Sequence, residues 1–295
     1  MNKFISGILL QNIYWQGVRR QRFSLILGIA LLAVSGAGQA TVIGGSSSSY
    51  VVGVNVSATL LGIPLVDLSV GPTPVSSGTA PTPYDVSNSV VSLNAGLGST
   101  LGIGAGLLNA DASSNIDGSD GPKFASASAS VLDIGIGALG LISLNLEAVA
   151  STASVSGDFG ALAAAGETTL AGAALSIAGT PIALIDIPAP NTVVDLSVLG
   201  LVGVSLLLNE QILTGDGVSN LGLAVNAIHL SFNAFVLGIA SLTGDIIISH
   251  AQAQIAAMPG QVAAPIPEPG TLALISSGFA ILGWKARRKT AASFA

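Results

Sequence analysis

The stretch LISLNLEAVAS, residues 141–151, alternates apolar and polar side chains almost one residue at a time. The apolar positions are Ile142, Leu144, Leu146, Ala148 and Ala150, and the polar ones between them are Ser143, Asn145 and Glu147. Because successive side chains of a β-strand point to opposite faces, this period of two predicts a strand with one face in a core and one in water.

Four other stretches show the same period: YVVGVNVSATLL (50–61), FASASASVLDIGI (124–136), HLSFNAFV (229–236) and IIISHAQAQI (246–255). We expect turns at residues 62–64 and 243–245, where glycine and proline or glycine and aspartate interrupt the pattern. The sequence therefore predicts an all-β body, built as a multi-stranded sandwich or an elongated stacked sheet. A solenoid is the alternative, although the repeated Ala-Ser and Leu-Gly phrases keep no fixed period.

Two stretches of the body depart from clear alternation. VVDLSVLGLVGVSLLLN, residues 193–209, alternates weakly and suits strands buried on both faces. DFGALAAAG, residues 158–166, is the best helix candidate, with Asp158 as N-cap and Gly166 as the stop.

The charges are distributed unevenly along the chain. Between residues 41 and 264 one lysine, Lys123, stands against fourteen acids, which gives this segment a net charge of −13. A segment so anionic and free of arginine cannot neutralise phosphates, so we expect no nucleic-acid partner. The chain has no cysteine, which excludes disulfides, thiolate catalysis and zinc-thiolate sites.

The N-terminal residues have the three parts of a secretory signal peptide. Four basic residues and no acid occur in residues 1–22, the apolar run FSLILGIALLAV follows, and Gly38 and Ala40 occupy the −3 and −1 positions of a cleavage site. Twelve helical residues at about 1.5 Å each are too short to cross a bilayer core of about 30 Å, which favours a signal peptide over a permanent anchor. We therefore expect the mature chain to begin near Thr41, after signal peptidase and the secretion machinery have acted.

The C-terminal stretch PIPEPGTLALISSGFAILGWKARRK, residues 265–289, combines three features. Pro267 and Pro269 hold Glu268 in an extended conformation that another protein can read. An apolar run of residues 271–284 follows, and Lys285, Arg287, Arg288 and Lys289 would stop translocation and stay cytoplasmic. A permanent membrane anchor is the plain alternative.

The order Pro267-Glu268-Pro269, apolar run and basic tail resembles the PEP-CTERM sorting signal of Gram-negative bacteria. That resemblance implies recognition by an exosortase, a membrane-embedded transpeptidase-like enzyme, and delivery to the cell surface or extracellular matrix after an inner-membrane intermediate. Exopolysaccharide is a candidate partner in that setting.

The body is similar, more loosely, to the exported proteins called choice-of-anchor P. The stretches that carry this likeness are SSYVVGVNVSATLLGIPLVDLSVGP, LLNADAS, SLLLNEQI, VNAIHLSF and TGDIIISHAQAQI. The resemblance implies similar exported bodies joined to different anchoring tails, and it implies no catalysis.

Residues 109–121, NADASSNIDGSDG, contain the best candidate for a metal site. Asp111, Asn115, Asp117 and Asp120 could offer oxygen ligands to calcium on a flexible loop. The closing glutamate of an EF-hand is missing, and Asp, Asn, Ser and Gly are also what an ordinary loop needs, so a plain loop is favoured.

Other catalytic patterns are weak. His229 and His250 are the only histidines and are expected on polar strand faces, no Gly-x-Ser-x-Gly elbow occurs, and GIGAG at 102–106 is typical of a strand or turn. Paired carboxylates for glycoside hydrolysis would have to come from Glu147, Glu167 and Glu210, whose separation a sequence does not give. The body has two tyrosines and no tryptophan, which argues against a sugar-binding cleft.

We therefore predict a signal peptide over 1–40, an all-β exported body over 41–260, and a sorting signal with a short transmembrane helix over 261–295. The predicted function is that of a non-enzymatic surface or matrix protein without a cofactor. The alternatives are an adhesive or ligand-binding module with a calcium-stiffened loop, and an extracellular hydrolase.

Overall fold

The computed structural model describes residues 41–60, 63–98, 100–196, 201–237 and 240–260, together with residues 274 and 277–279. The chain divides into two compact units, one of which is Ala40–Pro259 and the other Met1–Gln39 with Gly260–Ala295. Nearly all the described residues belong to the first unit, which we call the body.

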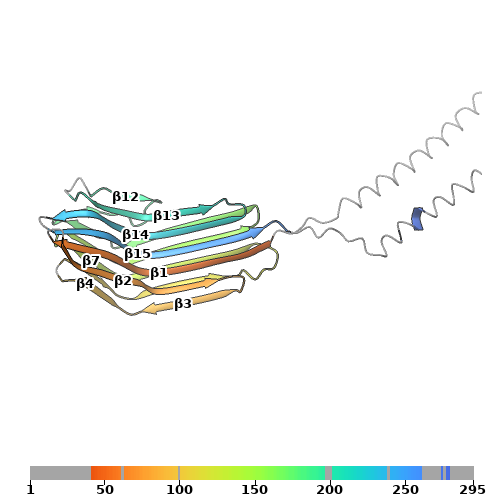
Figure 1. The fold of residues 1–295 in the computed structure, drawn as a ribbon, viewed down its shortest axis with the longest axis horizontal. Coiled ribbons are helices and arrows are strands. Elements are labelled where there is room, and N and C mark those ends of the chain that lie inside the picture. Colours follow the sequence, from red (N-terminus) through yellow and green to blue (C-terminus); the bar gives the residue numbers. More distant parts are fainter. Residues whose placement is uncertain are drawn as a thin grey trace, which may run out of the picture. The chain divides into compact units, whose positions relative to one another are not determined.

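The body is an antiparallel β-sandwich, as the alternation predicts (Figure 1). The six-stranded sheet has the order β12 (Thr192–Val194), β13 (Val204–Gly215), β14 (Asn220–Leu237), β15 (Ala240–Met258), β1 (Thr41–Leu60) and β2 (Ile63–Thr79). The second sheet has the path β11 (Thr180–Ala183), β10 (Ala174–Ile177), β8 (Ile142–Asp158), β7 (Lys123–Ala138), β5 (Leu101–Ala105) and β4 (Leu93–Leu97). Three strands of this nine-stranded sheet lie off that path: β6 (Leu108–Ser114) pairs with β7, β3 (Tyr84–Val90) with β6, and β9 (Ala161–Ala171) with β8.

The first and last strands of the body are neighbours. Thr41, the first residue of β1, pairs with Met258, the last residue of β15. The segments that precede and follow the body therefore join it at the same end of the sandwich. β1 begins at the residue where we predict the mature chain to begin.

The core between the sheets has two halves of different composition. The aliphatic half is built from large side chains, such as Leu144, Leu206 and Phe232, which are almost fully buried. The alanine-rich half lies where β1 begins and β15 ends, and it contains Ala125, Ala127, Ala153, Ala251, Ala253 and Ala257. The alanine-rich half is therefore packed from small side chains, whereas the other half is packed from large aliphatic ones.

Serine hydroxyls bridge the two sheets directly. Ser49 Oγ of β1 donates to the Asp111 carbonyl of β6 at 2.8 Å, and Ser76 Oγ of β2 donates to the Ala110 carbonyl at 2.7 Å. Ser249 Oγ of β15 donates to the Ala129 carbonyl of β7 at 2.8 Å. These polar side chains are almost fully buried, and the hydrogen bonds offset the cost of removing them from water.

The inward face of the strands changes at mid-length. In β15 the consecutive residues Ile248 and Ser249 are both buried, and Ser249 has a φ of 57°. In β13 Leu208 and Asn209 are both buried, and Asn209 has a φ of 50°. A left-handed residue breaks the strict alternation of a strand, so even-numbered residues of β15 face the core before Ser249 and odd-numbered ones after it.

Strand β8, which contains the alternating residues 142–150, also changes its inward face. Ile142, Leu144 and Leu146 are buried as predicted, but the buried positions then become Val149, Ser151 and Ala153. The alternation of residues 142–150 is therefore not continuous, and Ala148 and Ala150 do not extend the apolar face of Leu146.

Several sequence predictions for local structure are wrong. Residues 158–166 do not form a helix: Asp158 ends β8 and Ala161–Ala171 is β9, because the segment pairs antiparallel with β8. Residues 243–245 are not a turn but lie within β15, where Gly244 takes a φ of 128° opposite Val56. Residues 193–209 are not a continuous doubly buried strand, since β12 ends at Val194 and Val193 and Val202 are exposed.

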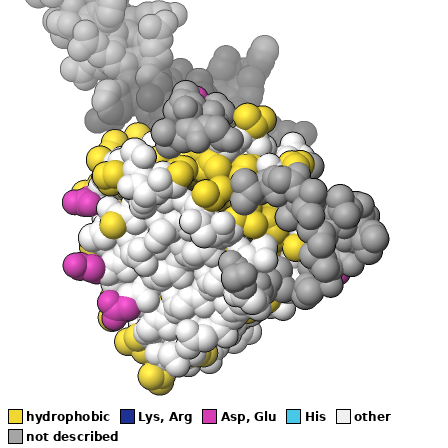
Figure 2. Space-filling model, turned by 90° about the vertical axis from the view of Figure 1, so that its left-hand side faces the viewer, with side chains coloured by type: hydrophobic (Ala, Val, Ile, Leu, Met, Phe, Trp, Pro, Cys, Tyr) yellow, Lys and Arg dark blue, Asp and Glu magenta, His cyan; other side chains and the backbone are white. Residues whose placement is uncertain are grey.

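Figure 2 views the body from the left-hand end of Figure 1. Hydrophobic side chains gather over the upper part of this face, and acidic side chains stand along one side. Among the described residues in view, no lysine or arginine is visible. The anionic charge of the body therefore lies at its surface.

Candidate functional site

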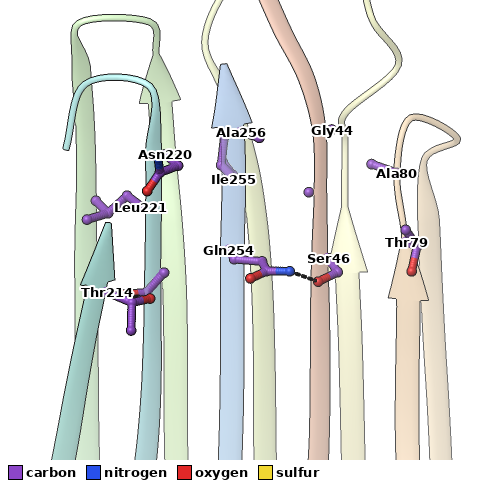
Figure 3. A pocket seen from close by; sticks show the side chains of 12 residues that line it. Gly44, Ser46, Thr79, Ala80, Thr214, Asn220, Leu221, Gln254, Ile255 and Ala256 are labelled. Carbon is purple, nitrogen blue, oxygen red and sulfur yellow. Dashed lines mark hydrogen bonds between the residues drawn. The ribbon is translucent and has the colours of Figure 1, made fainter. Parts of the chain in front are cut away.

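A shallow groove crosses the outer face of the six-stranded sheet, near the end where β1 begins (Figure 3). Its volume is about 470 Å³, and one cross-strand row of it consists of Thr214, Gly222, Gln254, Ser46 and Thr79. The row carries hydroxyl, amide or no side chains, which makes it uncharged and polar. The groove is hollowed at Gly222 and at the neighbouring Gly44, because these residues carry no side chain.

The polar side chains of this groove already bond to the protein. Gln254 Nε2 donates to Ser46 Oγ at 2.8 Å, Thr214 Oγ1 donates to the Gly222 carbonyl at 3.4 Å, and Asn220 Nδ2 donates to Ser219 Oγ at 3.3 Å. The groove residues therefore help to hold the strands in register, and no group among them is placed as a nucleophile or base.

The four calcium candidates lie in different surroundings. We expected Asp111 in a loop, but it lies in β6, where its carboxylate accepts hydrogen bonds from Ser87 and Ser128. Asn115 Oδ1 accepts the Phe124 N–H at 2.7 Å, and Asp120 Oδ1 accepts the Thr41 hydroxyl at 3.0 Å.

The fourth candidate, Asp117, is bound by the body's lysine. Lys123 Nζ lies 2.7 Å from Asp117 Oδ1 and also donates to Ser119 Oγ at 2.8 Å. The hydrogen bonds from Lys123 and Ser119 hold the pKa of the Asp117 carboxyl well below its usual range. An ammonium group thus pairs with the carboxylate of Asp117, which we considered as a calcium ligand. Among the described residues, no group of three or more His, Asp or Glu side chains is placed to hold a metal.

The two histidines belong to one polar cluster on the outer face of the six-stranded sheet. His229 Nδ1 lies 2.9 Å from Glu210 Oε2, and His229 Nε2 lies 3.2 Å from Asp245 Oδ1. Asn226 connects the second histidine to this group, because it donates to Glu210 Oε2 at 2.7 Å and accepts from His250 Nδ1 at 2.6 Å. No sequence pattern indicated this cluster, whose members come from β13, β14 and β15 and meet only through strand pairing.

His250 stacks on Tyr50 of β1, with ring centroids 4.5 Å apart. Burial lowers the pKa of His250, although Gln252 and Glu210 act in the opposite direction. Burial also raises the pKa of Tyr50, with a further contribution from the Glu210 charge. His250 is therefore neutral near pH 7 and more buried than the surface histidine we expected, which indicates a role in packing this face.

The glutamates proposed for glycoside hydrolysis do not form a pair. Glu210 belongs to β13 of the six-stranded sheet, while Glu147 and Glu167 belong to β8 and β9 of the other sheet. Within that sheet Glu167 pairs with Thr152, five residues along β8 from Glu147. The three carboxylates therefore do not face one another across a common cleft.

The predicted processing sites lie outside the described residues. These are Gly38 and Ala40 of the cleavage site, Pro267, Glu268 and Pro269 of the sorting motif, and Lys285, Arg287, Arg288 and Lys289 of the basic cluster. Of the apolar run, residues 274 and 277–279 are described as helical, and Ser277 Oγ donates to the Leu274 carbonyl at 3.0 Å. Within the described part of the chain, no helix is long and apolar enough to cross a membrane.

Residues 265–289 match the model of the PEP-CTERM protein-sorting motif. The chain carries a PEP-CTERM sorting signal. It is therefore an exported protein with a C-terminal membrane-anchoring signal, sorted by an exosortase-like system. The likeness of the body to the choice-of-anchor P family stays a prediction.

No curated protein matches the chain. Among solved structures, the attachment invasion locus protein Ail of Yersinia pestis aligns with a TM-score of 0.15 and 8% identity, over 73% of this chain and 99% of that one. Agreement at this level does not indicate a shared fold.

Proposed function

We propose that this PEP-CTERM protein is a non-enzymatic component of the cell surface or extracellular matrix, whose tail determines its destination and whose body is a stable β-sandwich. The sorting motif at residues 265–289 carries the proposal. An exosortase-like enzyme reads Pro267-Glu268-Pro269, while the apolar run and the basic cluster hold the intermediate in the inner membrane.

The geometry of the body supports a structural role. Its histidines bond to neighbouring strands, as in the contacts of His229 with Glu210 and Asp245, and its lysine, Lys123, is paired with Asp117. None of the serines with described hydrogen bonds has a histidine as its partner, an arrangement that a serine nucleophile would need. The shared end of β1 and β15 leaves the rest of the sandwich free of chain ends.

Replacement of Pro267-Glu268-Pro269 by Ala-Ala-Ala tests the proposal. In a host with the exosortase system, we expect this variant to be exported but to stay at its unprocessed size in the inner-membrane fraction. Replacement of Gln261 and Val262 by alanine is the matched control, since it changes the same segment outside the matched motif and should leave processing intact.

Neutralisation of Lys285, Arg287, Arg288 and Lys289 should act differently, by weakening retention and orientation before recognition. The readouts are the size of the protein on gels and its distribution between membrane and soluble fractions. If the Ala-Ala-Ala variant is shortened and released like the parent, the tail is only an anchor and the proposal fails.

A further inference from the structure

A second hollow lies on the outer face of the nine-stranded sheet, across β3, β6 and the start of β7. It has a volume of about 560 Å³, and Pro83, Asp85, Ser113, Asn115 and Phe124 contribute to its lining. Strand pairing brings these residues together, because Asp85 pairs with Ser113, and the Asn115 N–H donates to the Phe124 carbonyl. The hollow is thus formed by the sheet and the loop that follows β6.

Phe124 presents an aromatic ring at this surface. It is 39% exposed, while its neighbours Lys123 and Ala125 on β7 are buried. The residue across from it on β8 is Ser156, which is small and polar and leaves the ring uncovered on that side. An aromatic ring that lines a hollow together with polar groups can pack on the apolar part of a ligand while those groups bind its polar part.

The polar groups beside the ring are free to bind. Among the described residues, the side chains of Asp85 and Ser113 have no hydrogen-bond partner. Asn115 uses its Oδ1 for the Phe124 N–H at 2.7 Å, which fixes the side chain and leaves the amide NH₂ group without a described partner. The ion pair between Lys123 and Asp117 holds the loop that follows Asn115. The groove of Figure 3 differs, since its Gln254 amide bonds to Ser46 and none of its lining residues is aromatic.

We propose that this hollow binds a neutral carbohydrate. The weakly positive C–H groups of a sugar ring pack on the negative face of an aromatic ring, and its hydroxyls need closely spaced acceptors and donors. Phe124 supplies the ring face, Asp85 the acceptor, Asn115 the donor and Ser113 a group that does both. The net charge of −13 between residues 41 and 264 opposes uronic or sulfated sugars, so the ligand class is a neutral saccharide.

The scarcity of tyrosine and tryptophan in the body argued, from the sequence alone, against a sugar-binding cleft. The fold exposes a phenylalanine instead, whose position on the outer face depends on the register of β7. A carbohydrate site rests on the proposed function and deepens it, by naming a ligand class for the exported body. Binding at this site is measured without any sorting step.

The experiment uses the full-length chain in a detergent without a sugar head group, titrated calorimetrically with cellohexaose, maltohexaose and an oligogalacturonate as the anionic comparator. We expect one neutral hexasaccharide to bind and the oligogalacturonate not to bind. Phe124→Ala should weaken that binding about tenfold or more. Asp85→Asn should weaken it less, because the amide oxygen still accepts.

Leu132→Ala is the matched control, since Leu132 lies eight residues further along the same strand, on the same outer face, and is 43% exposed. It should bind like the parent, and thermal unfolding of all variants should confirm that each is folded. Absence of binding to both neutral probes, equal loss in Leu132→Ala, or no loss in Phe124→Ala would overturn the inference. Processing of the tail would be unchanged in every case, so failure here is distinct from failure of the sorting proposal.

Discussion

The body and the tail use their polar residues in opposite ways. In the body, Ser249 donates across the core to the Ala129 carbonyl, and Lys123 is bound to Asp117 of the loop that precedes its strand. In residues 265–289 the proline, glutamate and basic residues instead occur in the order of a signal that another protein reads. Changes in the body should therefore alter the free energy of unfolding, and changes in the tail should alter processing.

The largest effect on the body is expected from Gly244→Val. Gly244 has a φ of 128°, and a Cβ atom there would overlap the Asn55 carbonyl oxygen of β1. Both the backbone strain and the overlap oppose pairing of β15 with β1, so we expect loss of the folded body. Gly137→Ala on β7 is the control, because nothing lies within 4 Å of a Cβ at that position. Urea unfolding followed by circular dichroism measures both, and equal stability of the two variants would contradict the register of β15.

Phe232→Ala should have the next largest effect. Phe232 of β14 is 2% exposed in the aliphatic half, so truncation should lower the free energy of unfolding by about 3–5 kcal/mol. Phe124→Ala removes the same atoms at a position that is 39% exposed, and should cost less than about 1 kcal/mol. Chemical denaturation of the two variants measures both free energies of unfolding. A similar decrease for both would contradict the burial of Phe232 in the core and the exposure of Phe124.

Ser249→Ala tests the hydrogen bonds that bridge the sheets. The change removes the donor to the Ala129 carbonyl and one of the two partners of the buried Ser151 hydroxyl, which keeps its hydrogen bond to the backbone carbonyl of residue 249, so the expected cost is about 1–3 kcal/mol. Ser156→Ala, on the exposed face of β8, should be nearly neutral. Equal stability of Ser249→Ala and the parent in thermal unfolding would show that these hydrogen bonds do not contribute to holding the two sheets together.

The smallest effect concerns pH. Because burial lowers the pKa of His250 below its unfolded value of about 6.5, its neutral form contributes stability that is complete above pH 6.5. That contribution is lost as the pH falls from there through the folded pKa. The loss of stability between pH 7 and pH 5 should therefore be smaller in His250→Gln than in the parent. An equal or larger loss in the variant, measured by thermal unfolding, would contradict a buried neutral histidine.

The all-β fold was predictable because most strands have one polar and one buried face. Alternation identified β1, β7, β8, β14 and β15. The change of face near Ser249 was missed, although the apolar positions of residues 246–255 switch there from even to odd numbers, because the stretch was interpreted as one continuous alternation. Residues 158–166 were the best helix candidate because Asp158 and Gly166 suit the two ends of a helix, but pairing with β8 makes the segment part of a sheet.

The candidate sites also differ in how far the sequence predicted them. The sorting motif was predictable because its recognition depends on a short continuous sequence. The cluster of Glu210, His229 and Asp245 was not, because its successive members are 19 and 16 residues apart and meet through strand register. The hollow at Phe124 depends on pairing of the same kind, in which β3 is brought beside β6.

The most direct test of the central claim transfers residues 261–295 to an unrelated exported protein and expresses the fusion in hosts with and without the exosortase system. We expect the fusion to be shortened and to leave the inner-membrane fraction only in the host that has the enzyme, while the body without its tail is exported and never processed. A fusion that stays full-length and membrane-bound in both hosts would contradict the claim that the tail alone determines the destination of this protein.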